Sequence, residues 1–143
     1  MNRKALFSFA AGLLIGSAAT AASGTKGRVV RDAPAKTAPS GKAKAIPLIH
    51  SGIGAGSAYM GLLEMKAGAA VPLHRDPTEE YIYVIAGGGT ISIDGEEHVV
   101  YQGDAIFMPA NAEVSFAASE KGETHVLQVF APGGPESKYE SWK

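Results

Sequence analysis

Three side chains that can bind a proton or a metal ion lie close together in the sequence: His74, Asp76 and Glu80. His74 and Asp76 are two residues apart, so in an extended strand their side chains share one face. Glu80 can join them after a turn at Pro77-Thr78. One imidazole and two carboxylates can hold a divalent ion, although they form a harder and weaker ligand set than one richer in histidine.

Each of these residues also has an ordinary structural interpretation. His74 could be a hydrogen-bonded histidine at the end of a strand. Asp76, which precedes Pro77, is a natural turn residue. Glu79 rather than Glu80 could be the carboxylate that faces inward. The sequence leaves these alternatives open.

The composition restricts the chemistry further. The chain has 143 residues and no cysteine, which excludes disulfide scaffolds, thiolate metal sites, iron–sulfur clusters and cysteine nucleophiles. It is 45% hydrophobic and 19% charged, as expected of a single globular domain. Its 18 glycines favour tight turns and a β-rich fold.

Residues 1–21 have the pattern of a secretory signal peptide. Arg3 and Lys4 precede an uncharged run of small and apolar residues, and Ala19-Thr20-Ala21 has the small-x-small form of a cleavage site. A retained membrane anchor is the alternative, but the run is short and rich in small residues. We therefore expect a periplasmic or secreted protein.

Residues 22–45 are predicted to be a basic flexible linker. They contain six basic residues and one acidic residue, with alanine, proline, glycine, serine and threonine filling most of the rest. The alternative is a basic arm for anionic lipid or polymer, so membrane contact is expected only through this linker or an uncleaved signal. Residues 46–143 carry five basic and 13 acidic residues, which argues against nucleic-acid binding.

Short apolar runs separated by turn residues occupy the chain from Ile46 onward. Asp94-Gly95 between two alternating runs is a strong hairpin signal, and no stretch has a convincing helical period. The pattern predicts a β-sandwich or barrel. The expected strands are 46–50, 57–65, 71–75, 80–86, 89–94, 97–101, 104–108, 113–118 and 123–130.

The spacing of several residues resembles the cupin family. Gly68, His74, Glu80 and Gly87 stand at the offsets of the first cupin motif, and Gly103 with Pro109 matches the start of the second. The resemblance covers residues 46–136 and implies an all-β double-stranded β-helix, or jelly-roll barrel. A cupin domain with a C-terminal tail is therefore expected over residues 46–143.

The resemblance also implies a metal site inside the barrel. Cupins hold one divalent ion with two histidines and a glutamate from the first motif and a histidine from the second. Here His74 and Glu80 match, Asp76 replaces the second histidine, and Val114 replaces the third. The expected ion, if one binds, is Mn, Fe, Zn, Ni or Cu.

A further polar residue could complete the site from the last predicted strand. His125 and Gln128 are an odd number of residues apart, so only one of them can face the barrel interior. Val126, Gln128 and Phe130 form a plausible inward row, which favours Gln128 as a ligand-binding residue beside His74, Asp76 and Glu80.

Two functions are consistent with this pattern. The first is an exported binding module that holds a small polar or sugar-like molecule in its barrel, with a weak or atypical metal site. The alternative is a metal-dependent enzyme of the dioxygenase, isomerase, lyase or decarboxylase type. Fold alone does not decide between them, and the loss of a ligand at Val114 favours the binding module. A homodimer formed through sheet faces or edges is a further expectation.

Overall fold

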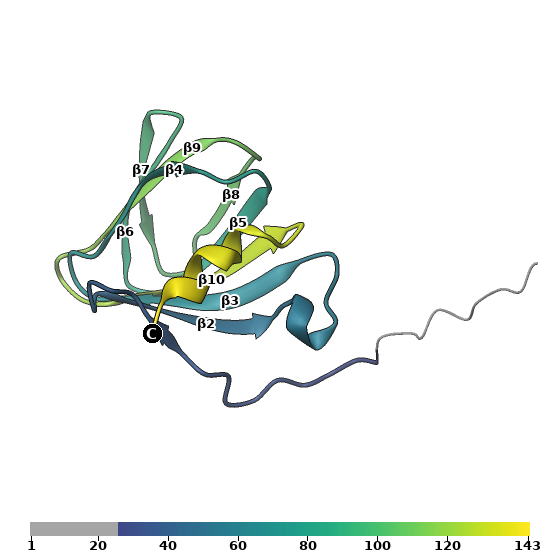
Figure 1. The fold of residues 1–143 in the computed structure, drawn as a ribbon. Helices are drawn as coiled ribbons and strands as arrows, with labels where there is room; N and C mark the ends of the chain where they lie inside the picture. The colour runs from purple at the N-terminus through teal and green to yellow at the C-terminus, as the bar shows by residue number, and fades with distance from the viewer. Residues whose placement is uncertain (1–25) are drawn as a thin grey trace, which may run out of the picture.

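The computed structural model describes residues 26–143, so the predicted signal peptide lies outside the described residues. Within the described residues, ten strands form two antiparallel sheets that face each other (Figure 1). One sheet has the order β1-β2-β3-β10-β5-β8 and the other has the order β4-β9-β6-β7. The predicted all-β jelly-roll fold is confirmed.

Each of the nine predicted strands corresponds to an observed one. No helix in the described part of the chain is long and apolar enough to cross a membrane. The strands are β1 (Lys36–Thr37), β2 (Ala43–Ile49), β3 (Tyr59–Met65), β4 (Ala70–Arg75), β5 (Glu79–Ala86), β6 (Gly88–Ile93), β7 (Glu96–Tyr101), β8 (Ala105–Met108), β9 (Glu113–Ala118) and β10 (Thr124–Ala131), and two short 3₁₀ helices are η1 (Ser51–Ile53) and η2 (Pro135–Ser141).

Alternation along the strands produces the interior of the barrel. Every second residue of β3 and β10 is buried, including the predicted row Val126, Gln128 and Phe130. The turn at Asp94-Gly95 joins β6 to β7, and both residues have the positive φ that this tight hairpin requires. The local sequence therefore determines which face of β3 and β10 is buried and how β6 connects to β7.

The boundary of the predicted linker needs correction. Residues 26–35 contain no regular secondary structure, but β1 and β2 lie within the predicted linker 22–45, and Ala45 is completely buried. The lysines that suggested a linker alternate with alanines over residues 42–45, so Lys44 faces solvent while Ala45 packs in the core. Packed structure thus begins about ten residues before Ile46.

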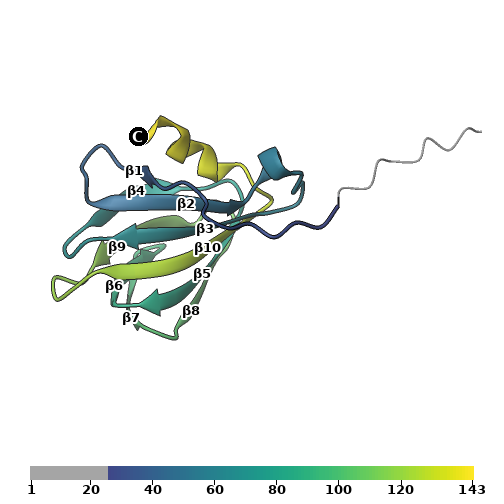
Figure 2. The same cartoon turned by 90° about the horizontal axis from the view of Figure 1, so that it is seen from below.

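The C-terminal residue of the chain pairs with β1 at one end of the barrel. The backbone N–H of Lys143 donates a hydrogen bond of 3.0 Å to the carbonyl of Thr37, and the Thr37 N–H donates to Lys143 in return. η2 lies beside β1 at this end (Figure 2). Tyr139 and Trp142 pack against the core with ring centroids 4.8 Å apart. The tail is thus part of the domain and stands next to the cavity.

Candidate functional site

A cavity of about 790 Å³ fills the centre of the barrel. Its walls are mainly apolar, and most of its polar side chains gather where β4 leads into β5, while Ser40 and Lys42 line it near the turn between β1 and β2. The apolar lining includes Leu63, Met65, Val71, Ile82, Val84, Ile91, Ile106, Met108, Val114, Phe116 and Val126, and the polar group comprises His74, Asp76, Glu80, Gln128 and Lys138. We call these five polar residues the polar cluster.

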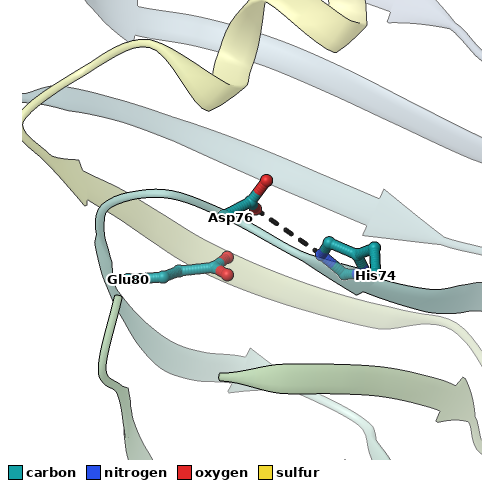
Figure 3. Close-up of side chains that lie close together, drawn as sticks. All are labelled: His74, Asp76 and Glu80. Carbon is teal, nitrogen blue, oxygen red and sulfur yellow. Dashed lines mark ion pairs between the residues drawn. The ribbon is translucent and has the colours of Figure 1, made fainter. Parts of the chain in front are cut away.

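His74 lies near the end of β4, where its ring contacts two acceptors. Its Nδ1 lies 2.9 Å from the carbonyl oxygen of Pro72, and its Nε2 lies 3.5 Å from Oδ2 of Asp76 (Figure 3). Because Nδ1 donates a hydrogen bond to the carbonyl, a neutral ring would turn the lone pair of Nε2 toward the Asp76 carboxylate. A protonated ring can donate to both acceptors. The hydrogen bond to Asp76 and that to Pro72 together outweigh burial, and they raise the pKa of His74.

Asp76 follows β4 directly and contacts two cationic groups. Its Oδ2 accepts a hydrogen bond of 2.8 Å from Nζ of Lys138, in addition to the contact with His74. Burial raises the pKa of this carboxyl, but the hydrogen bonds from His74 and Lys138 lower it by more, so the pKa lies below its ordinary value. Asp76 therefore occupies a turn, as its position before Pro77 suggested, and also faces the cavity.

Glu80, and not Glu79, is the inward carboxylate of β5. Glu80 is 5% exposed, whereas Glu79 is exposed and accepts a hydrogen bond from Tyr81. Figure 3 shows the Glu80 carboxylate pointing toward His74. Burial raises the pKa of Glu80, and the hydrogen bond from Gln128 offsets only part of this effect.

Gln128 connects Glu80 to the C-terminal tail. Its Nε2 donates to Oε1 of Glu80, and its Oε1 accepts a hydrogen bond of 2.7 Å from the hydroxyl of Tyr139. Gln128 is buried, so each of its polar atoms needs a partner and has one. His125 instead lies on the outer face of β10, with Nε2 3.3 Å from Glu123.

Lys138 is the member of the cluster that the sequence did not predict. It lies in η2, 62 residues from Asp76, and its Nζ stands 4.9 Å from the centroid of the Phe130 ring and 5.8 Å from that of Tyr139. Both rings are in range for a cation–π interaction. No motif or spacing marks this lysine, because its position depends on how the tail docks.

The spacing of the cluster suits a metal ion, but its charges do not. His74, Asp76 and Glu80 each offer a ligand atom, and these atoms lie within 4.8 Å of one another. However, one oxygen of each carboxylate already accepts a hydrogen bond, from Lys138 or from Gln128. An ion bound at Asp76 would stand against the Lys138 ammonium, so the group does not fit a resident metal while Lys138 stays in place.

The position opposite His74 on the neighbouring strand contributes no ligand. Val114 in β9 pairs directly with His74 in β4 and lines the same cavity. Its side chain is buried and apolar. The sequence predicted that this position lacks a metal ligand, and the structure provides no second imidazole in its place. The further group beside the carboxylates is the ammonium of Lys138.

Comparison with known proteins assigns the family. The profile of the cupin domain matches residues 61–138, more than half of the chain. The protein belongs to the cupin family. This cupin is 27% identical over 85 residues to the polyketide synthase CurC of Streptomyces cyaneus, which covers 59% of this chain. It spans 55% of that relative's length.

Solved structures with the same fold include three bacterial proteins. An RmlC-like cupin from Shewanella frigidimarina has a TM-score of 0.67 and 16% identity, covering 78% of this chain and 96% of its own. KdgF from Halomonas sp. has a TM-score of 0.68 and 17% identity, covering 78% and 99%. The polyketide cyclase RemF from Streptomyces resistomycificus has a TM-score of 0.67 and 24% identity, covering 77% and 82%.

Proposed function

We propose that this cupin binds a small organic molecule with an apolar body and one polar end. The observation that carries the proposal is the division of the cavity, in which an apolar interior ends in the polar cluster. The expected sugar-like ligand would place hydroxyl groups against the apolar walls, where they would lose hydrogen bonds to water without replacing them. A carbonyl or hydroxyl group at one end of an apolar ligand would instead meet His74 and Glu80.

Fluorescence of the single tryptophan tests this proposal, because Trp142 lines the cavity. The chain is titrated with 1,8-dihydroxyanthraquinone, a rigid aromatic probe with three of its four oxygens along one edge, and separately with glucuronate. We expect saturable quenching by the anthraquinone and none by glucuronate. The reverse preference would favour the sugar-like ligand and would refute an apolar one.

A matched pair of variants locates the bound probe. Val114→Phe fills part of the cavity beside His74, whereas Val99→Phe makes the same change on the exposed face of β7. We expect the first to weaken anthraquinone binding at least tenfold and the second to leave it unchanged. Equal affinities would place the probe outside the cavity.

The same geometry supports an enzyme as a second candidate. His74 and Glu80 face one cavity, and the pKa of each is raised above its ordinary value. A raised pKa brings the Glu80 carboxyl closer to neutral pH, at which proton exchange is most effective. The similar proteins called polyketide synthase and polyketide cyclase favour a carbonyl compound as substrate. In this proposal Glu80 removes a proton next to the carbonyl, and His74 donates a hydrogen bond to the carbonyl oxygen.

Deuterium exchange tests the catalytic proposal separately from binding. 1-Tetralone, an aromatic ketone with exchangeable protons next to its carbonyl, is incubated with the protein in deuterated buffer and followed by proton NMR. We expect exchange faster than in buffer alone and its loss in Glu80→Gln. Binding without faster exchange would leave the binding module as the function and exclude this catalytic role.

We further propose that the protein is exported, which rests on the pattern of residues 1–21. Expression of the full chain in a bacterium, followed by mass spectrometry of the periplasmic fraction, tests it. The expected product begins at Ala22. An uncleaved chain in the membrane fraction would favour the retained anchor instead.

A further inference from the structure

The polar cluster contains its own cation. Asp76 and Glu80 bring two carboxylates to one end of an apolar cavity, where unpaired negative charge is costly. In the cupin motif a divalent ion balances the charge of the one glutamate. Here the Lys138 ammonium lies 2.8 Å from Asp76 and, together with His74, favours the charged form of Glu80.

The surrounding residues hold Lys138 in this position. The next residue, Tyr139, is buried, and its hydroxyl donates a hydrogen bond to Gln128, which fixes η2 against β10. The ammonium also lies over the ring of Phe130, whose side chain is completely buried. Although the Lys138 side chain is 37% exposed, it is therefore anchored at both its backbone and its charged end.

The chemistry of an ammonium differs from that of a metal ion. It supplies one positive charge and three N–H donors, but it has no open coordination position at which a ligand oxygen could bind. A site balanced in this way can orient a polar group by hydrogen bonds. It also excludes a metal, because the ammonium and the ion would both lie against the Asp76 carboxylate and repel each other.

We propose that Lys138 replaces the metal ion of this cupin, and that removing its charge converts His74, Asp76 and Glu80 into a metal site. The inference goes beyond the proposed ligand binding, since metal content is measured without any organic ligand. The two proposals can therefore fail separately.

Metal titration of Lys138→Met tests the inference. Methionine keeps an unbranched side chain of similar length and loses the charge. Lys138→Arg keeps the charge, and Lys121→Met removes an exposed lysine outside the cluster. All proteins are purified with a tag that contains no histidine, so that the tag does not bind metal. Bound metal is removed with a chelator, and each protein is then dialysed against Mn²⁺, Ni²⁺ or Zn²⁺. The number of metal ions per chain is measured by inductively coupled plasma mass spectrometry, and the metal affinity by isothermal titration calorimetry.

The expected result is a gain of metal in one variant alone. Wild type, Lys138→Arg and Lys121→Met should keep no stoichiometric metal after dialysis, whereas Lys138→Met should bind at least about tenfold more tightly, which corresponds to about 1.4 kcal/mol. Adding Glu80→Gln to Lys138→Met should abolish the gain, which would place the ion at the cluster.

Two results would overturn the inference. One is a wild-type protein that holds one equivalent of metal as tightly as Lys138→Met, because Lys138 would then not exclude the ion. The other is a folded Lys138→Met, verified by circular dichroism, with no gain in affinity for any of the three metals. If Lys138→Met does not fold, Lys138→Gln takes its place, and the wild-type titration is informative without either variant.

Discussion

The two strands that meet at the polar end of the cavity carry different side chains. β4 and the turn after it bring His74 and Asp76 to the cavity, whereas β9, which pairs with β4, presents Val114 and Phe116. The polar side has hydrogen-bond partners from β10 and η2, and the apolar side needs none. In this cupin the tail, rather than a ligand from β9, completes the polar site.

The largest expected effect comes from the apolar side. Ile91→Ala should lower the free energy of unfolding by about 2–5 kcal/mol, because it leaves a hole beside a cavity that already exists. Ile91 is completely buried and lines the cavity. Urea denaturation measures the change, with the exposed Val99→Ala as the control, for which we expect less than about 0.5 kcal/mol. Similar losses of unfolding free energy for the two variants would mean that the apolar wall of the cavity contributes no more stability than an exposed residue.

The strands and the apolar wall were predictable because their signals are local. Alternation of apolar and polar residues specifies which face of a strand is buried, so the nine strands and the inward row ending in Phe130 could be predicted from neighbours two residues apart. The start of the domain was placed too late, because lysines conceal the alternation that buries Ala45.

The polar site was predictable only in part, for the same reason. His74, Asp76 and Glu80 meet because one turn joins β4 to β5, and that turn was visible at Pro77. Lys138 reaches them from a distant part of the chain through the docking of η2. No local pattern encodes such a contact, so the charge balance that distinguishes this site required the three-dimensional structure.

On the polar side, Gln128→Leu should lower the free energy of unfolding by about 1–3 kcal/mol, because it leaves Glu80 and the Tyr139 hydroxyl without their buried partner. Gln102→Leu makes the same change at an exposed turn and should have little effect. Thermal or urea denaturation of both variants gives the comparison. If Gln128→Leu matched the control, the hydrogen bonds from β10 and η2 would not stabilise the polar side.

A metal-binding side chain on β9 would make this strand more like β4. In the Lys138→Met background, Val114→His adds an imidazole beside His74, at the position where the cupin motif has one. We expect metal affinity to rise about tenfold further, or about 1.4 kcal/mol, by calorimetry. With Lys138 present, the same substitution should give a smaller gain. Equal gains in both backgrounds would show that Lys138 and the ion do not compete.

The smallest effect is a gradient of stability with pH that distinguishes the two carboxylates of the polar side. The pKa of Glu80 is raised in the folded protein by burial, so the folded chain binds more protons than the unfolded chain between the ordinary and the raised pKa. Stability from Glu80 is therefore highest at low pH and falls as the pH rises through that window. Asp76, whose pKa is lowered, acts in the opposite direction, and stability from it is lost as the pH falls. The raised pKa of His74 adds stability that is lost as the pH rises above the ordinary pKa of histidine.

Because these contributions overlap, the useful quantity is the difference in the free energy of unfolding between wild type and Glu80→Gln. This variant keeps an oxygen acceptor for Gln128 and removes the titration of residue 80. Urea denaturation between about pH 4 and pH 7 should show this difference shifting in favour of the variant as the pH rises, since it no longer buries a charge. Glu79→Gln, one residue away on the exposed face, should show no such trend. A difference for Glu80→Gln that stays constant across the range would mean that the interior of this cupin does not raise the pKa of Glu80.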